Sequence, residues 1–139
     1  MKVSRAVPAL ICLVGCLACS TGPDDDAPPA VEVSILSVDL DAQVVTGTMR
    51  NMGGQSLTFG DCSAGLESGA SGDWIRIPRE GACDMWGGSL RPGKAAAFDV
   101  PLPSVLPGCP LRVAVGLGVE GFLDFTVIGH STEFCPGAA

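Results

Sequence analysis

Three short patterns in the chain hold residue types that could do chemistry, and the first is a serine among small residues. Ser63 lies in Gly60-Asp-Cys-Ser-Ala-Gly65 and could act as a nucleophile if a base stood within hydrogen-bond reach. His130 is the single histidine, and its neighbours Gly129 and Ser131 predict an exposed loop. We therefore expect no catalytic residue and no enzyme; the alternative is a small hydrolase that depends on His130.

The second pattern is Gly116-Leu-Gly-Val-Glu-Gly121, which has the G-x-G-x-x-G spacing of phosphate-binding loops. Such a loop binds an anion where it opens a helix, because the N–H groups of the first turn then face the phosphate. Here the β-formers of Phe122–Ile128 follow, and only 18 residues remain after Gly121. We expect a hairpin turn and no bound cofactor.

The third pattern, Cys12-x3-Cys16-x2-Cys19, matches the iron–sulfur ligand spacing of radical S-adenosylmethionine enzymes. It lies inside an apolar N-terminal segment, and 139 residues are too few for the barrel that this chemistry requires. The later cysteines contain no C-x-x-C pair. We therefore expect no metal site.

The four later cysteines are Cys62, Cys83, Cys109 and Cys135, at separations of 21, 26 and 26 residues. An even number of cysteines in an exported domain indicates disulfides, and four cysteines allow three pairings. We favour the pairs Cys62–Cys83 and Cys109–Cys135. Each disulfide then closes a single segment between cysteines that are consecutive in the domain. Each bridge would contribute about 3 kcal/mol through loop closure.

Residues 1–15 are typical of an export signal. Lys2 and Arg5 precede an uncharged apolar run that ends near Cys19, short of the ~20 apolar residues of a spanning helix. Within it, Leu13-Val14-Gly15-Cys16 resembles the lipobox of bacterial lipoproteins. The resemblance implies cleavage before Cys16, a diacylglyceryl group on its thiol, and a lipid-anchored protein of the cell envelope. An ordinary cleaved secretory peptide is the alternative.

Residues 16–30 predict a flexible tether between the lipid and the domain. They show no apolar periodicity, contain three prolines and include the acidic run Asp24–Asp26, which we interpret as solvated. Leu17, and not an aspartate, follows Cys16. By the same resemblance this favours the outer over the inner membrane in a Gram-negative cell.

The charge balance excludes nucleic acid as a partner. The chain has 15 acidic and 8 basic residues, a net charge of −7. Cleavage before Cys16 would remove Lys2 and Arg5 and leave 15 acidic against 6 basic residues, or −9. Phosphate binding needs clustered Lys and Arg, and here they are scattered.

Residues 31–136 predict one all-β domain without a helical stripe. Period-two alternation is punctuated by turns such as Arg91-Pro-Gly93, where Pro92 and Gly93 suit the central positions of a type II turn. Seven or eight short strands predict an immunoglobulin-like two-sheet β-sandwich, with Ser63–Ala82 largely irregular. The expected strands are Val31–Leu40, Gln43–Asn51, Ser56–Phe59, Asp73–Ile77, Lys94–Val100, Leu111–Gly118, Phe122–Ile128 and a short Ser131–Phe134.

The two tryptophans are the remaining candidates for contact with a partner. Alternation in Asp73–Ile77 places Trp74 either in the core or under the excursion between Cys62 and Cys83, and we favour the core. Trp86 stands in a loop beside Cys83, where an exposed indole would be a binding hot spot. Packing of Trp86 over the sheet edge is the alternative.

A set of core and turn positions spans nearly all of residues 31–135 and matches a known pattern. They are Gly47-Thr-Met-Arg-Asn51, Leu57-Thr-Phe59, Leu90-Arg-Pro-Gly93, Phe98, Pro107-Gly108, Leu111-Arg-Val-Ala-Val115 and Phe134. On these residues the chain resembles the bacterial intracellular-proteinase-inhibitor (BsuPI-type) and related immunoglobulin-like domains, which implies the sandwich fold.

Two functions remain as expectations. The leading one is a non-catalytic, lipid-anchored envelope protein, a binding or structural module that contacts the membrane through its lipid and a protein partner in the envelope. The alternative, implied by the resemblance, is a proteinase inhibitor that acts through an exposed loop, either Ser63–Ala82 or Pro101–Pro110.

Overall fold

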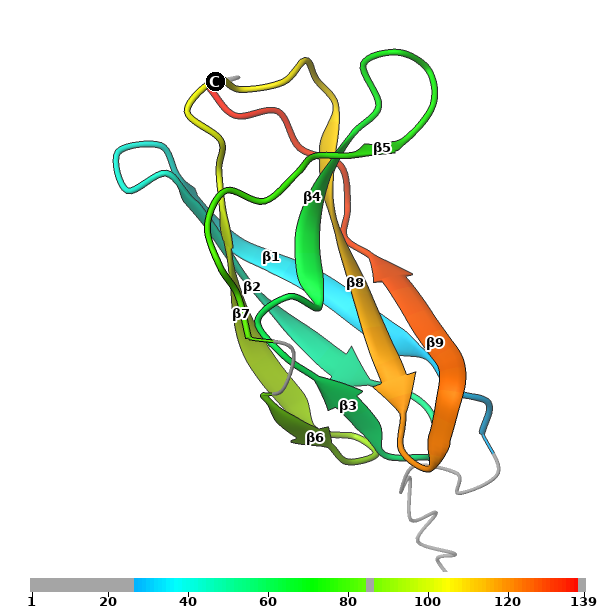
Figure 1. The fold of residues 1–139 in the computed structure, drawn as a ribbon. Helices are drawn as coiled ribbons and strands as arrows, with labels where there is room; N and C mark the ends of the chain where they lie inside the picture. The colour runs from blue at the N-terminus through cyan, green and yellow to red at the C-terminus, as the bar shows by residue number, and fades with distance from the viewer. Residues whose placement is uncertain (1–26, 85–86, 138–139) are drawn as a thin grey trace, which may run out of the picture.

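The computed structural model of the protein describes residues 27–84 and 87–137, with residues 122–125 described by their backbone alone. Within these ranges the chain forms nine strands, and no helix there could span a membrane. The expected export signal, Cys16, most of the tether and Trp86 lie outside the described residues. Figure 1 shows an elongated all-β domain, with its C-terminal segment at the end opposite to the point where the described chain begins.

The first sheet has three antiparallel strands in the order β1-β2-β7. They are β1 (Val31–Asp39), β2 (Val44–Asn51) and β7 (Ala95–Pro101). Alternate residues of β2 are buried, as expected for a strand with one face on a core. A register shift between Ile35 and Ser37 interrupts the pairing of β1 with β2, whereas β2 and β7 pair without a shift.

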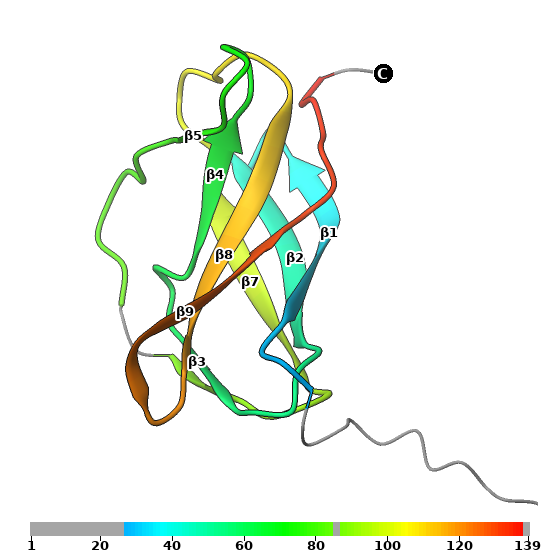
Figure 2. The same cartoon turned by 90° about the vertical axis from the view of Figure 1, so that its right-hand side faces the viewer.

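The second sheet is built around one long central strand, β8 (Leu111–Val119). β9 (Phe122–His130) pairs with it on one side, and β3 (Leu57–Phe59) and β4 (Ala64–Ser68) pair with it one after the other on the other side. The outer strands are β5 (Ile75–Arg76), beside β4, and β6 (Gly88–Leu90), beside β3. Figure 2 shows this sheet facing the sheet of β1, β2 and β7.

The strand pairs β3–β4 and β5–β6 explain why nine strands appear where seven or eight were expected. β3 and β4 follow one line along β8, and β5 and β6 follow a second line outside them. If each line is counted as one interrupted strand, the domain has the seven strand positions of an immunoglobulin-like sandwich. The expected two-sheet, all-β fold is therefore confirmed.

The core lies between the sheets and is almost entirely aliphatic. β8 contributes alternate inward residues that are fully buried, and the opposite sheet contributes Val45, Met49 and Val100. The inward residues of β8 are Leu111, Val113, Val115, Leu117 and Val119. This is the period-two pattern that the sequence predicted for the strand.

One buried polar side chain connects the two sheets at the end where the described chain begins. Asn51 is fully buried; its amide nitrogen donates to the carbonyls of Gln55 and Leu90 at 2.7 and 2.8 Å, and its side-chain oxygen accepts the N–H of Gly53 at 2.9 Å. The side chain therefore links the end of β2 to β6. At the same end, Lys94 donates to the carbonyl of Arg91 and Gly93 has a φ of 73°, which confirms the predicted type II turn.

Several expected elements differ from the structure. Ser63–Ala82, expected to be largely irregular, contains one strand that was not expected, β4, and the expected strand Asp73–Ile77 is present as the two-residue β5. β6 begins at Gly88, where a turn was expected, and Ser131–Phe134 forms a single bridge between Phe134 and Leu111 in place of a strand. Weak β-formers such as Ala and Gly conceal β4 in the sequence, and pairing with the central strand β8 compensates for them.

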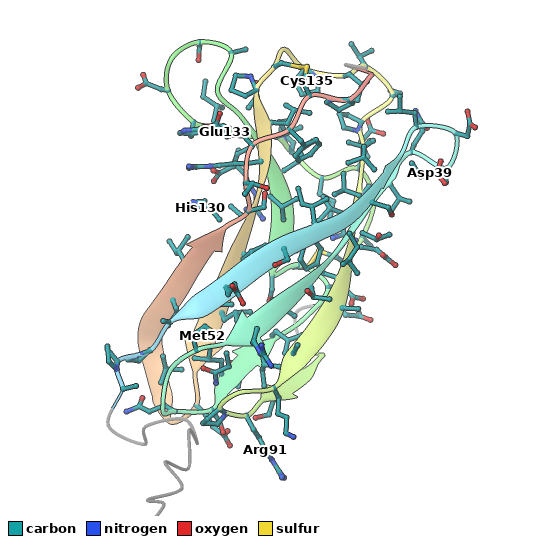
Figure 3. All side chains as sticks on the ribbon, turned by 180° about the vertical axis from the view of Figure 1, so that it is seen from behind. Asp39, Met52, Arg91, His130, Glu133 and Cys135 are labelled. Carbon is teal, nitrogen blue, oxygen red and sulfur yellow. A yellow bond between two sulfur atoms is a disulfide. The ribbon has the colours of Figure 1, made fainter. Side chains whose placement is uncertain are left out.

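Residues 27–30, assigned to the tether by the sequence analysis, are in contact with the domain. The carbonyl of Ala27 accepts the N–H of Gly54 at 3.0 Å, and the carbonyl of Ala30 accepts the N–H of Met52 at 2.9 Å. The chain therefore enters the fold beside the turn between β2 and β3. Figure 3 labels Met52 and Arg91 near this end, and Asp39 and Cys135 at the opposite end.

Candidate functional site

The strand β7 forms one edge of its sheet and has no strand partner on its outer side among the described residues. The N–H of Leu102 donates to the carbonyl of Gln43 at 2.8 Å, so even-numbered residues here bond to β2. Backbone hydrogen-bonding groups alternate in direction along a strand, and the odd-numbered residues therefore point outward. The residues with outward N–H and C=O groups are Ala95, Ala97 and Asp99.

Opposite β7, residues 77–84 form a segment that we call the strap, which leads from β5 toward β6. The N–H of Ile77 donates to the carbonyl of Leu66 at 2.9 Å, and the disulfide between Cys62 and Cys83 attaches the other end. Arg79 Nη1 donates to the carbonyl of Asp61 at 2.7 Å. The strap is thus held to the β3–β4 line at several points, and among the described residues no hydrogen bond joins it to β7. Figure 1 shows it passing on the same side of the molecule as β7.

A hollow of about 160 Å³, here called the flank pocket, lies between β7 and the strap. Apolar side chains of both sheets line most of it, including Leu66 and Ile77 on one side and Val100 and Leu102 on the other. An apolar cavity of about 150 Å³ is large enough to bind benzene. The flank pocket can therefore hold one leucine-sized or phenylalanine-sized side chain.

A second hollow continues along the same edge and is polar. It has a volume of about 320 Å³ and is lined by Asp61, Arg79, Ala97, Phe98 and Asp99. Arg79 lines both hollows, so they adjoin. Together the unpaired edge of β7, the flank pocket and this polar hollow form one continuous surface, which we call the open flank.

On the opposite side of the sandwich, here called the closed flank, β1 lies against β9. A Cβ atom placed on Gly129 of β9 would lie 2.6 Å from Val31 Cγ1 and 2.8 Å from the carbonyl oxygen of Val31 on β1. The backbones of β1 and β9 therefore approach so closely that only glycine fits. None of the three chemical patterns in the sequence pointed to the difference between the flanks, which depends on how the two sheets are placed.

A polar cluster lies on the outer face of the second sheet, and it includes two residues singled out from the sequence. Trp74 is half-buried and stacks on Arg112, whose guanidinium carbon is 4.0 Å from the ring centroid, so the expectation that Trp74 belongs to the core is wrong. Arg112 Nε lies 2.8 Å from Glu67 Oε2, and His130 Nε2 lies 3.8 Å from the same oxygen. His130 is exposed, as expected, but it is the last residue of β9 and not part of a loop.

The serine considered as a nucleophile is engaged elsewhere. Ser63 Oγ accepts the backbone N–H of Gly60 at 2.9 Å, which stabilises the break between β3 and β4. Its carbonyl accepts the N–H of Gly116, on the side of β8 opposite to β9 and His130. The structure thus does not bring Ser63 and His130 together.

The two cysteine pairs favoured from the sequence are joined in the structure. Cys62 pairs with Cys83, with Cα atoms 5.4 Å apart, and Cys109 pairs with Cys135, with Cα atoms 5.5 Å apart. The first bridge holds the strap, and the second ties the loop before β8 to the C-terminal segment. Gly116 and Gly118 lie in β8 and Gly121, with a φ of 86°, forms the turn to β9, which confirms the hairpin interpretation of the glycine-rich pattern.

The loop of residues 102–110 stands at the end of the molecule away from the point where the described chain enters (Figure 1). Its ends are fixed, because Leu102 is buried and Cys109 is bridged to Cys135. Its middle is apolar and exposed: Val105 retains 82% and Leu106 42% of their accessible surface. This loop is therefore a second candidate contact surface, beside the open flank.

Among residues 27–84 and 87–137 no group of three or more His, Cys, Asp or Glu side chains is arranged to bind a metal ion. No protein-family model matches the chain, and no curated protein matches its sequence. The proposals below therefore depend on the residues and geometry of this chain alone.

Proposed function

We propose that the protein is a non-catalytic binding module that is anchored by a lipid on Cys16 to the bacterial cell envelope, with the outer membrane favoured by Leu17. The observation that carries the proposal is the sequence Leu13-Val14-Gly15-Cys16 after a charged and apolar export signal. Two or three acyl chains, at about 0.8 kcal/mol per buried methylene, would hold the protein on the membrane permanently.

The architecture supports this proposal in two ways. Two disulfides suit an oxidising compartment outside the cytoplasm. The described chain begins at Ala27 beside the β2–β3 turn, whereas the exposed loop of residues 102–110 is at the other end (Figure 1). A lipid on Cys16 would thus connect to the end of the domain that leaves this loop and the open flank accessible.

Intact mass spectrometry of the membrane fraction tests the anchor. We expect the wild-type chain to begin at residue 16 and to carry acyl mass, and Cys16→Ala to lose that mass. Cys19→Ala is the matched control, because it removes a neighbouring thiol outside the lipobox and should leave acylation unchanged. A soluble, unacylated wild-type chain would overturn the proposal.

A proteinase inhibitor is the second candidate, and the loop of residues 102–110 favours it. Val105 and Leu106 are exposed apolar residues on a loop that is fixed at both ends, a geometry suited to occupying a protease cleft. Of the two loops expected for this role, Ser63–Ala82 is less suitable because it contains β4 and β5.

Titration against elastase-type and chymotrypsin-type proteases tests inhibition. We expect stoichiometric inhibition by the wild type if this function holds, and its loss in Leu106→Asp or Val105→Asp. Ile128→Asp is the control. Ile128 is also apolar and 65% exposed, but it lies on β9 opposite Gly116 in the middle of β8 and not in the loop. Absence of inhibition across the panel, or equal inhibition by all variants, would reject this second candidate.

A further inference from the structure

We draw no further inference here: the strongest candidate, the unpaired edge of β7 with the flank pocket beside it, carries no proposal, because the acidic and basic residues around it balance and nothing in the described part of the chain shows what covers it.

Discussion

On one flank of the sandwich β1 lies directly against β9, whereas on the other flank β7 pairs with no further strand of residues 27–84 and 87–137 and faces a strap held by a disulfide. The closed flank depends on the close approach of two backbones at Gly129. The open flank depends on a covalent bridge and on a few hydrogen bonds, such as that from Ile77 to Leu66. The comparison shows that the two flanks of one small domain are held by different means, close backbone packing on one side and a segment tied by a disulfide on the other.

The largest decrease in the free energy of unfolding is expected when the disulfide on the open flank is removed. Cys62→Ala/Cys83→Ala opens a loop with a separation of 21 residues and should lower the free energy of unfolding by about 3 kcal/mol, because the unfolded chain regains loop entropy. Urea denaturation measures the loss. Hydrogen exchange in the strap should also become faster.

The second bridge is the control for this prediction. Cys109→Ala/Cys135→Ala opens a similar loop, with a separation of 26 residues, and should cost a similar free energy of unfolding. It should leave exchange in the strap close to that of the wild type at temperatures where both variants are folded. Equal acceleration in the strap by both variants would show that the bridge between Cys62 and Cys83 is not what holds the open flank.

The next largest effect is expected on the closed flank. Gly129→Ala places a Cβ within 2.8 Å of both a side chain and the backbone of Val31, so β1 must move and the variant should lose about 1–3 kcal/mol. Gly116→Ala is the matched control on the neighbouring strand, since its Cβ would meet only Thr126 Cγ2 at an ordinary 3.6 Å. Thermal unfolding of both variants checks the difference, and equal stabilities would mean that β1 and β9 are not closely packed.

A smaller effect is expected from Gly65→Ala, although its Cβ would overlap the guanidinium of Arg76. The overlapping atoms are the far end of a flexible side chain and not backbone, so Arg76 can move away. The cost should be the hydrogen bond from Arg76 Nη1 to the carbonyl of Ala114, or about 1 kcal/mol. A loss as large as that of Gly129→Ala in the same unfolding measurement would show that the open flank is packed as rigidly as the closed one.

The smallest decrease in the free energy of unfolding is expected from a change on the outer face of the second sheet, which belongs to neither flank. Glu67→Gln removes the negative charge that Arg112 and His130 share but keeps an oxygen that can accept the bond from Arg112. The pair is partly exposed, so the loss should be below about 1 kcal/mol and should shrink as salt is added. A loss that is larger and insensitive to salt would contradict this picture of the cluster.

Much of the framework could be predicted because it depends on local pattern. The alternation of apolar residues in Leu111–Val119, the type II turn at Pro92-Gly93 and the turn at Gly121 each follow from short-range sequence and are present in the structure. The lipobox-like residues around Cys16 are recognised from the sequence alone, and lipidation of Cys16 remains a prediction. The candidate site was less predictable, since Arg79, Leu66 and Val100 have no unusual spacing along the chain.

The sequence by itself determined the class of the fold, because the period-two burial of a strand and the φ preferences of Pro and Gly act within a few residues. Only the tertiary structure decided that Ala64–Ser68 is a strand, since Ala, Gly, Glu and Ser extend there to satisfy the backbone of β8. It also decided that Trp74 stacks on Arg112 outside the core. The open edge of β7 is a tertiary property for the same reason: whether a strand has a neighbour depends on the packing of segments far apart in the chain, which no local pattern records.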